Sequence, residues 1–258
     1  MDLYQVLSPT NIILFIGIMT RLTGLLSSAP LFSNYPIPMM AKVWFAALVA
    51  FILFPMIYAK ANFIMPTSMP ELTLILIKEF FIGFAIGFCA KIIFVGVEMG
   101  VNMFAIQMGL AADQALNPTS GGSSPIITQA YTWLLTMIFL CVCAHHWLFS
   151  AVYRSFVNVP MGYGFVLNST ITHQIIVISC QMFSVGLQIA LPIFGILLIT
   201  DVLLGFTSKM MPQLNIFMVS IPLKVYLGLF LSLIFMKPIA ATMEVLLERM
   251  ITQLSVVF

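Results

Sequence analysis

Residues 72–95, LTLILIKEFFIGFAIGFCAKIIFV, decide the fold class of this chain. Apolar residues run through this stretch almost without interruption, and a helix needs about 20 such residues to cross a bilayer. The strands of a membrane barrel would instead show about ten residues of alternating apolar and polar character. The stretch therefore predicts a long membrane-type helix.

Five further apolar stretches extend this prediction along the chain. They cover residues 11–32, 41–59, 126–152, 174–203 and 214–236. Residues 239–257 show an amphipathic pattern, which predicts a last helix that lies at a membrane interface or is covered by a partner. Because no internal repeat or soluble segment is visible, we expect an all-α, polytopic membrane-type protein that forms one domain over residues 1–258.

Composition excludes most soluble functions. Of the 258 residues, 62% are hydrophobic and 7% are charged, against about 25% charged residues in an average soluble domain. The formal net charge is +2 without any basic run, so the electrostatic footprint of a nucleic-acid-binding protein is missing. We therefore expect membrane lipid or other apolar protein around this chain, and no nucleic-acid partner.

Charged residues inside the apolar stretches are the first departure from an ordinary membrane helix bundle. The stretch over residues 72–95 contains Lys78, Glu79 and Lys91. Each charge at a bilayer centre costs about 2.5 to 3.5 kcal/mol even on an insertion scale. Arg21 and Lys224 lie in other apolar stretches. Such side chains can lie at helix ends and reach the interface. For Arg21, Lys78 and Lys224 we favour an assembly site instead.

Two small-residue motifs occur in the same region, Gly83-x-x-x-Gly87 and Gly96-x-x-x-Gly100. Glycines at this spacing share one helix face and let two helix backbones approach closely. Because each glycine also lowers helix propensity, tight packing is the natural compensation. The spacing leaves open whether the packed helix belongs to this chain or to another subunit.

One polar segment interrupts the apolar sequence. Residues 109–125, GLAADQALNPTSGGSSP, form what we call the polar loop. Its glycine, serine, asparagine and proline residues disfavour a helix and are typical of a tether. Long loops without structure are functional or disordered. The composition alone favours a surface linker over a plug inside a pore.

Methionine is frequent, with 19 residues in the chain. Its unbranched side chain suits surfaces that seal and re-pack. Met99 and Met103 share a helix face, and Met108 directly precedes the polar loop. These three residues are candidates for a seal around a conduit, although a methionine stripe is more often plain packing.

The sequence offers no catalytic constellation. His145 and His146 are adjacent, so on a helix their side chains diverge by about 100° and do not chelate one metal as an i, i+4 pair would. The H-E-x-x-H, G-x-S-x-G and P-loop motifs are missing from the sequence. We therefore expect no catalytic residue, no metal ligand and no cofactor.

Residues 201–224, DVLLGFTSKMMPQLNIFMVSIPLK, resemble the signature of the FliR family, which comprises flagellar export-gate proteins and their virulence type III secretion counterparts. The segment Pro212-Gln-Leu-Asn215-x-Phe217 is the most specific part of this resemblance. Residues 30–33, PLFS, and the histidine pair also match. The resemblance covers nearly the whole chain, and its pattern favours a flagellar over a virulence role.

The resemblance implies a non-enzymatic subunit of a protein export gate in the bacterial inner membrane. One such subunit would join FliP-type and FliQ-type subunits, with a FlhB-type subunit added, and pack as helical hairpins around a passage for unfolded flagellar proteins. The buried charges would then meet carboxylates or carbonyls of neighbouring subunits. The residues implied in assembly are Arg21, Lys78, Gly83, Gly87, Pro212, Gln213, Asn215 and Lys224.

The same resemblance reverses the preference for a linker, because the family's loop acts as a plug below a methionine-rich constriction. The implied plug residues are Gly109, Asp113, Asn117, Pro118, Gly121, Gly122, Ser123, Ser124 and Pro125.

Two other functions remain as alternatives. Pro192 and Pro222 lie within apolar stretches, and broken helices line the sites of solute transporters. A small-solute carrier or ion channel would fit that pattern, although carriers usually show paired repeats. An intramembrane enzyme using His145, Glu98 or Asp113 lacks any spaced constellation.

Overall fold

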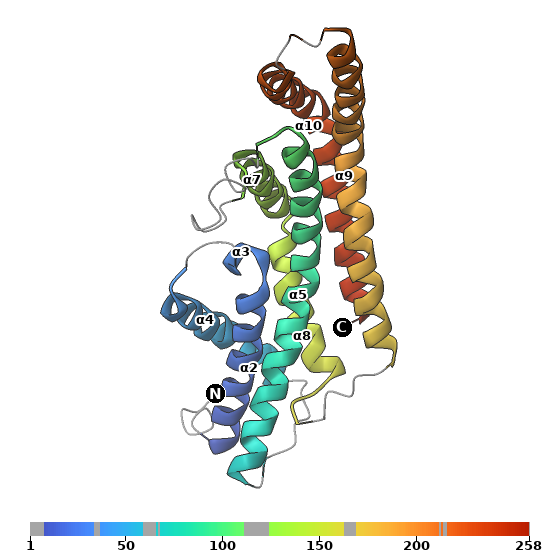
Figure 1. Ribbon diagram of the computed structural model, residues 1–258. Coiled ribbons are helices and arrows are strands. Elements are labelled where there is room, and N and C mark those ends of the chain that lie inside the picture. Colours follow the sequence, from blue (N-terminus) through green and yellow to red (C-terminus); the bar gives the residue numbers. More distant parts are fainter. Residues whose placement is uncertain are drawn as a thin grey trace. The chain divides into compact units, whose positions relative to one another are not determined.

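The computed structural model describes residues 8–33, 37–58, 66, 68–110, 124–162, 169–211, 213 and 216–257, and these contain helices and no strand (Figure 1). The helices are α2 (Pro9–Ser28), α3 (Pro30–Ser33), α4 (Met39–Tyr58), α5 (Met69–Gln107), α7 (Ile126–Cys141), α8 (Ala144–Asn158), α9 (Ser169–Met210) and α10 (Ile216–Val257). By length and composition, five of the described helices can cross a membrane, or six if the bent pair α7 and α8 is one span. The predicted all-α polytopic fold is confirmed.

Two predicted helices are interrupted by local backbone chemistry. α2 ends at Ser28, and Ala29 is extended with a ψ of 135° before Pro30 begins α3. A residue before proline is disfavoured in the helical region, which explains this break. The stretch predicted as one helix over residues 126–152 is two helices bent by 64°. Cys143, with a φ of 55°, lies at the bend in the left-handed region.

Other predicted helices are longer in the structure than in the sequence pattern. α5 runs to Gln107, beyond the predicted end at Val95. α10 continues through Pro222 and Pro238, so the predicted last span and the predicted amphipathic tail form one helix. Membrane helices tolerate proline because neighbouring groups re-satisfy the freed backbone.

The chain separates into two compact units. Unit 1 comprises Met1–Ile92, Cys143–Ile178 and Glu248–Phe258, and unit 2 comprises Ile93–Val142 and Ser179–Leu247. The single domain expected over residues 1–258 stays a prediction.

The core of unit 1 forms where α2 packs against the first part of α5. Leu14, Ile18 and Leu22 of α2 are fully buried. A Cβ atom at Gly83 or Gly87 would overlap atoms of α2, so both glycines are needed for this close approach. The helix that Gly83-x-x-x-Gly87 accommodates therefore belongs to the same chain.

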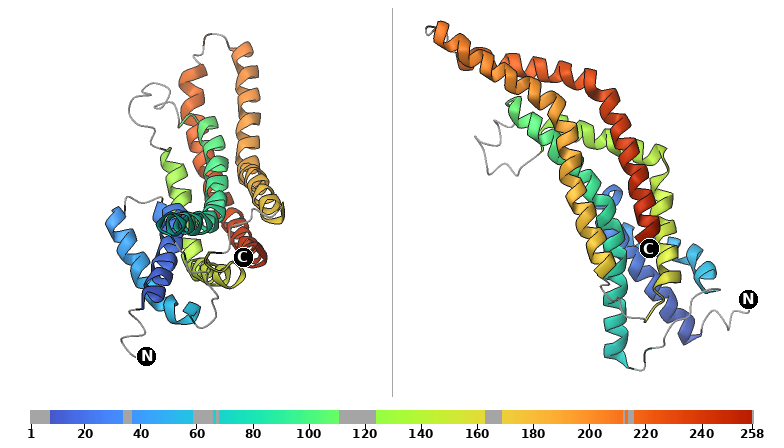
Figure 2. Two further views of the ribbon diagram at one scale, coloured as in Figure 1. Left: turned by 90° about the horizontal axis from the view of Figure 1, so that it is seen from below. Right: turned by 90° about the vertical axis from the view of Figure 1, so that its right-hand side faces the viewer.

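Unit 2 packs the second part of α5 against α7 and against the α9–α10 hairpin, whose helices run side by side (Figure 2). A Cβ atom at Gly100 would overlap the backbone of Gly186 in α9, so this small-residue motif also packs within the chain. Phe94 and Phe104 of α5 make edge contacts with Phe139 and Tyr131 of α7, respectively.

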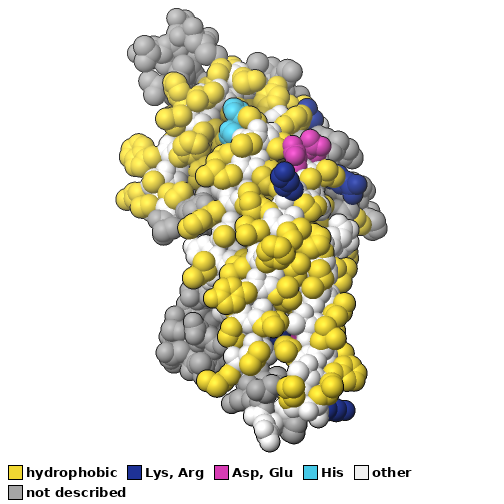
Figure 3. All heavy atoms as spheres, turned by 90° about the horizontal axis from the view of Figure 1, so that it is seen from above, with side chains coloured by type: hydrophobic (Ala, Val, Ile, Leu, Met, Phe, Trp, Pro, Cys, Tyr) yellow, Lys and Arg dark blue, Asp and Glu magenta, His cyan; other side chains and the backbone are white. Residues whose placement is uncertain are grey.

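Large apolar side chains remain exposed on the molecule. α9 and α10 carry many of them, including Leu203, Phe206 and Leu233, and α4 exposes Trp44 and Phe51. On the face drawn in Figure 3, hydrophobic side chains cover most of the surface and charged ones are few. Such a surface fits lipid or partner proteins better than water.

Candidate functional site

The start of the polar loop is fixed by the end of α5. Gly109 has a φ of +85°, which a glycine adopts without steric cost. Its N–H donates to the carbonyl of Ile106 at 2.9 Å, and the N–H of Leu110 donates to the carbonyl of Ala105 at 3.1 Å. This pair of bonds is a Schellman motif, which satisfies the last carbonyls of a helix and ends it at a defined residue.

Met108 holds the same helix end by packing. Its side chain is fully buried, and a Cβ atom at Gly228 of α10 would lie 2.5 Å from its Cγ. Met99 and Met103, the other two candidate seal residues, are half-buried. Met108 therefore fills a notch within unit 2, and a seal formed by the three methionines stays a prediction.

The polar loop itself is described only at its two ends. The second end is fixed by Pro125, whose carbonyl accepts from the N–H of Gln129 in the first turn of α7 at 3.1 Å. Ser124 is exposed. The remaining predicted plug residues lie outside the described residues: Asp113, Asn117, Pro118, Gly121, Gly122 and Ser123.

A cluster of three polar side chains lies beside the start of the polar loop, and we call it the Asp201 cluster. Asp201 of α9 accepts a hydrogen bond on Oδ2 from Nε2 of Gln107 at 2.6 Å. Its Oδ1 forms an ion pair with Nζ of Lys224 in α10. We expected Lys224 to meet a group of a neighbouring subunit, whereas the structure provides its counterion within the chain. The apolar surroundings explain this, because a charge is retained at low cost only when it is paired.

Other polar groups of unit 2 are also paired between helices. The hydroxyl of Thr128 donates to Oδ1 of Asn102 at 2.7 Å, which joins α7 to α5. The hydroxyl of Tyr131 donates to the carbonyl of Ser232 at 3.1 Å, which joins α7 to α10. Hydrogen bonds between helices therefore fix the register of α7, as expected where water does not compete.

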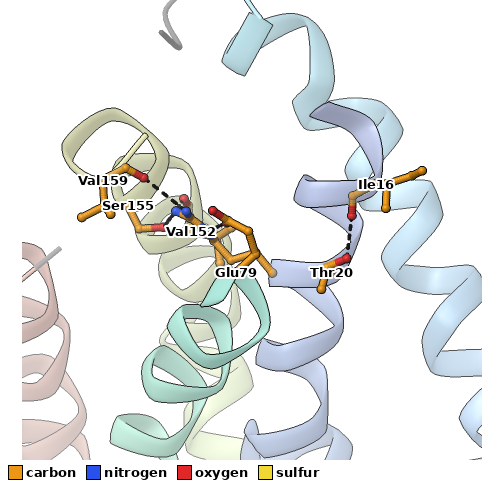
Figure 4. Close-up of polar contacts among 7 residues, drawn as sticks. Ile16, Thr20, Glu79, Val152, Ser155 and Val159 are labelled. Atoms are coloured by element: carbon orange, nitrogen blue, oxygen red, sulfur yellow. Dashed lines mark hydrogen bonds and ion pairs between the residues drawn. The ribbon is translucent and has the colours of Figure 1, made fainter. Parts of the chain in front are cut away.

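Unit 1 contains a fully buried arginine. The side chain of Arg21 is 0% exposed, and its Nε donates to Oε2 of Glu79 in α5 at 2.6 Å. Nη1 donates to the hydroxyl of Ser155 at 2.8 Å, and Nη2 donates to the carbonyl of Val159 at 3.2 Å (Figure 4). The guanidinium carbon lies 3.6 Å from the centroid of the Phe156 ring. Arg21 thus joins α2, α5 and α8.

This arrangement differs from the expectation that Arg21 meets a neighbouring subunit. The desolvation of a buried charge is offset only by a close counterion and satisfied hydrogen bonds, and the structure provides both within unit 1. Lys78, one residue before Glu79, is exposed and forms no ion pair within the described ranges. Lys91 is half-buried. An assembly role remains a prediction for Lys78.

The structure shows few contacts for the histidine pair and for the segment over residues 212–217 that carries the family resemblance. The ring centroids of His145 and His146 lie 4.4 Å apart, and Nδ1 of His145 has no hydrogen-bond partner among the described residues. In the part of the chain that the structure describes, no group of three His, Cys, Asp or Glu residues is arranged to hold a metal ion. Gln213 is exposed, whereas Pro212 and Asn215 lie outside the described residues.

Comparison with known proteins decides the family. The family model described as bacterial export proteins, family 1, matches residues 12–250. The chain is 30% identical over 235 residues to the flagellar biosynthetic protein FliR of Escherichia coli strain K12, covering 91% of this chain and 88% of the relative. This chain belongs to the FliR family. It is also 26% identical over 230 residues to the flagellar biosynthetic protein FliR of Bacillus subtilis strain 168, covering 87% and 86% of the two chains.

Within this FliR-family chain, sequence reasoning missed Glu79 and Asp201 as the partners of Arg21 and Lys224, and it missed the contact of Gln107 with Asp201. Gln107 was overlooked because a single glutamine in an apolar stretch carries no motif. Glu79 was noted only as one of several charges, although a buried arginine requires an acidic partner. Pairing each intramembrane cation with the acidic residues of other stretches would have given a short list that included both Asp201 and Glu79.

Proposed function

We propose that this FliR-family chain is a subunit of the flagellar protein export gate in the bacterial inner membrane, and that its polar loop closes the passage through which unfolded protein leaves. The observation that carries the proposal is the way α5 ends. An apolar helix stops at Gly109 in a Schellman motif, with Met108 buried beside it. A segment of polar composition then begins at that fixed point.

The proposed mechanism is a passive gate. A loop rich in glycine and serine has no packed core that must unfold before an exported chain displaces it. The energy for transport comes from elsewhere in the export machine. Met99 and Met103 are half-buried, and in this proposal they contribute to the seal around the passage together with partner subunits.

The proposed partners are FliP-type, FliQ-type and FlhB-type subunits. The support is the extensive apolar surface of α9 and α10, together with the exposed Lys78 and Gln213. Arg21, Gly83 and Gly87 act inside unit 1, so their contribution to assembly is indirect, through the shape of this unit. Pro212 and Asn215 are proposed for assembly on the family resemblance alone.

The structure does not show the broken helices that suggested a small-solute carrier. That function was suggested by Pro192 and Pro222, but α9 and α10 run through these prolines without a break in the helix. The intramembrane-enzyme alternative named His145, Glu98 and Asp113, and Asp113 lies outside the described residues. The structure therefore gives no observation that favours this alternative.

Deletion of residues 121–125 tests the proposed function. The complex should still assemble, as measured by co-purification of its subunits, while the cells leak small ions. A matched control replaces the same five residues by a glycine–serine sequence of equal length, which keeps the bulk of the loop and should not leak. Unchanged ion permeability of the deletion variant would contradict the plug.

A further inference from the structure

We propose that an exposed face of α5 in unit 1 binds a helix of a partner subunit, and that this helix places a carboxylate opposite Lys78. The inference rests on the proposed function, because it names the chemistry of one contact between this chain and a partner. The face consists of five residues that we call the phenylalanine stripe: Leu74, Ile77, Phe81, Phe84 and Phe88.

The phenylalanine stripe lies on the side of α5 that faces away from the core of unit 1. Its five side chains are between 38% and 58% exposed. On the other side of the helix, Ile75, Ile82 and Ile86 are at most 5% exposed, and a Cβ atom at Gly83 would overlap α2. This part of α5 therefore buries one face within unit 1 and leaves an apolar face open.

The spacing of the stripe favours a helix as its occupant. The five residues are alternately three and four positions apart, which is the spacing of the a and d positions in a seven-residue repeat. Such a seam is buried when two helices pack side by side with interlocking side chains. Lipid requires no seam, and α4 fits lipid better, because 17% of an apolar stretch of 18 residues is buried in α4 and 61% in α5.

The aromatic rings of the stripe are held in place before any partner binds. The rings of Phe84 and Phe88 stack with their centroids 6.1 Å apart, and Phe80 stacks on Phe84 at 6.3 Å. Side chains that are already ordered lose little entropy on binding. Fully buried anchors in a packed centre carry most of the binding energy of an interface, and these rings fit that task.

Lys78 determines the charge of the proposed partner helix. It directly follows Ile77, so it takes the position that flanks the apolar seam, where paired helices form salt bridges with each other. Lys78 is exposed and forms no ion pair within the ranges that the structure describes. The adjacent Glu79 is bound to Arg21 inside unit 1. A cation at an apolar contact requires a counterion, and a carboxylate of the partner helix supplies it.

Photo-crosslinking of the intact export complex, made in cells together with its partner subunits, identifies the occupant. In the variant Phe81→benzoylphenylalanine, light inserts the ketone into a nearby C–H bond. Mass spectrometry should find the adduct on an apolar segment of a partner subunit that contains Asp or Glu. Phe51→benzoylphenylalanine is the matched control, because Phe51 of α4 is 75% exposed and should give lipid adducts.

Charge variants at Lys78 test the carboxylate. Lys78→Glu should lower the amount of co-purified partner by about tenfold, since like charges in an interface are strongly disfavoured. Lys78→Arg keeps the charge and should stay within about twofold of the native chain. Replacing the partner's crosslinked Asp or Glu by Lys should restore the assembly of Lys78→Glu, which a folding defect of unit 1 would not allow. Lys237→Glu, at an exposed lysine of α10, is the control and should change assembly by no more than about twofold.

The outcomes separate this inference from the proposed function. Adducts of the Phe81 variant with lipid alone, or with a second copy of this chain, would overturn the inference. Assembly of Lys78→Glu at the level of Lys78→Arg, or a loss that the charge-reversed partner does not restore, would also overturn it. None of these results would affect the plug, which the 121–125 deletion tests by itself. If the native chain co-purifies with no export-gate subunit, the proposed function fails and this inference fails with it.

Discussion

Replacement of Arg21 by methionine gives the sharpest prediction for the stability of unit 1. Arg21→Met keeps an unbranched apolar stem but leaves the carboxylate of Glu79, 3% exposed, without its counterion. Removing one partner of a buried ion pair costs about 3 to 5 kcal/mol. The hydroxyl of Ser155 and the carbonyl of Val159 lose their donors as well. We therefore expect the free energy of opening of unit 1 to fall by about 3 to 5 kcal/mol.

Cys89 provides the assay. It lies in the unit 1 part of α5 with 1% exposure, whereas Cys141, Cys143 and Cys180 are exposed. After the three exposed cysteines are replaced by serine, a thiol reagent labels the purified protein only when unit 1 opens. Because about 1.4 kcal/mol corresponds to a tenfold change, Arg21→Met should speed the labelling of Cys89 by about a hundredfold to a few thousandfold.

Two further variants identify the cause of this effect. The double variant R21M/E79L leaves neither charge buried, so it should recover most of the lost protection. Lys78→Met removes an exposed cation that forms no ion pair within the described residues, and it should change the labelling rate by no more than about twofold. If Arg21→Met labels no faster than Lys78→Met, or if R21M/E79L labels as fast as Arg21→Met, the buried ion pair does not carry the stability.

Two other predictions concern packing and lipid contact. Gly83→Ala should lower the unfolding midpoint by about 2 to 10 °C in a circular dichroism melt, because the added Cβ atom overlaps α2. Gly205→Ala is the control. A Cβ atom at Gly205 has no other atom within 4 Å, so this variant should leave the midpoint unchanged or raise it. In a chain with Trp133→Phe and Trp147→Phe, shallow brominated lipids should quench the fluorescence of Trp44, 75% exposed near the start of α4, more than deep ones do. If brominated lipids do not quench the fluorescence of Trp44, the exposed face of α4 is covered by protein and does not contact lipid.

Helix type and fold class could be predicted from the sequence because they depend on local pattern. The nearly continuous apolar run over residues 72–95 was sufficient to predict a membrane-type helix. A barrel strand would show alternating apolar and polar residues instead, and a soluble surface helix would show a polar face. The break between Ser28 and Pro30 was also within reach, because the residue before a proline disfavours the helical region. The polar loop was located for the same reason, through its glycine and proline content.

The contacts that fix the candidate site depend on residues distant in the sequence. Arg21 and Glu79 are 58 positions apart, and Gln107 and Asp201 are 94 apart. Small-residue spacing predicted a close helix approach at Gly83 but did not identify α2 as the partner. The bend at Cys143 was missed because a non-glycine residue with positive φ leaves no reliable signal in the sequence.

The conductance of the purified complex in a planar bilayer tests the central claim most directly. With the native chain, the complex should stay closed to small ions under an applied voltage. The same complex lacking residues 121–125 should show discrete open-channel currents. Equal, closed recordings from both complexes would contradict the account, because the polar loop would then not be what closes the passage.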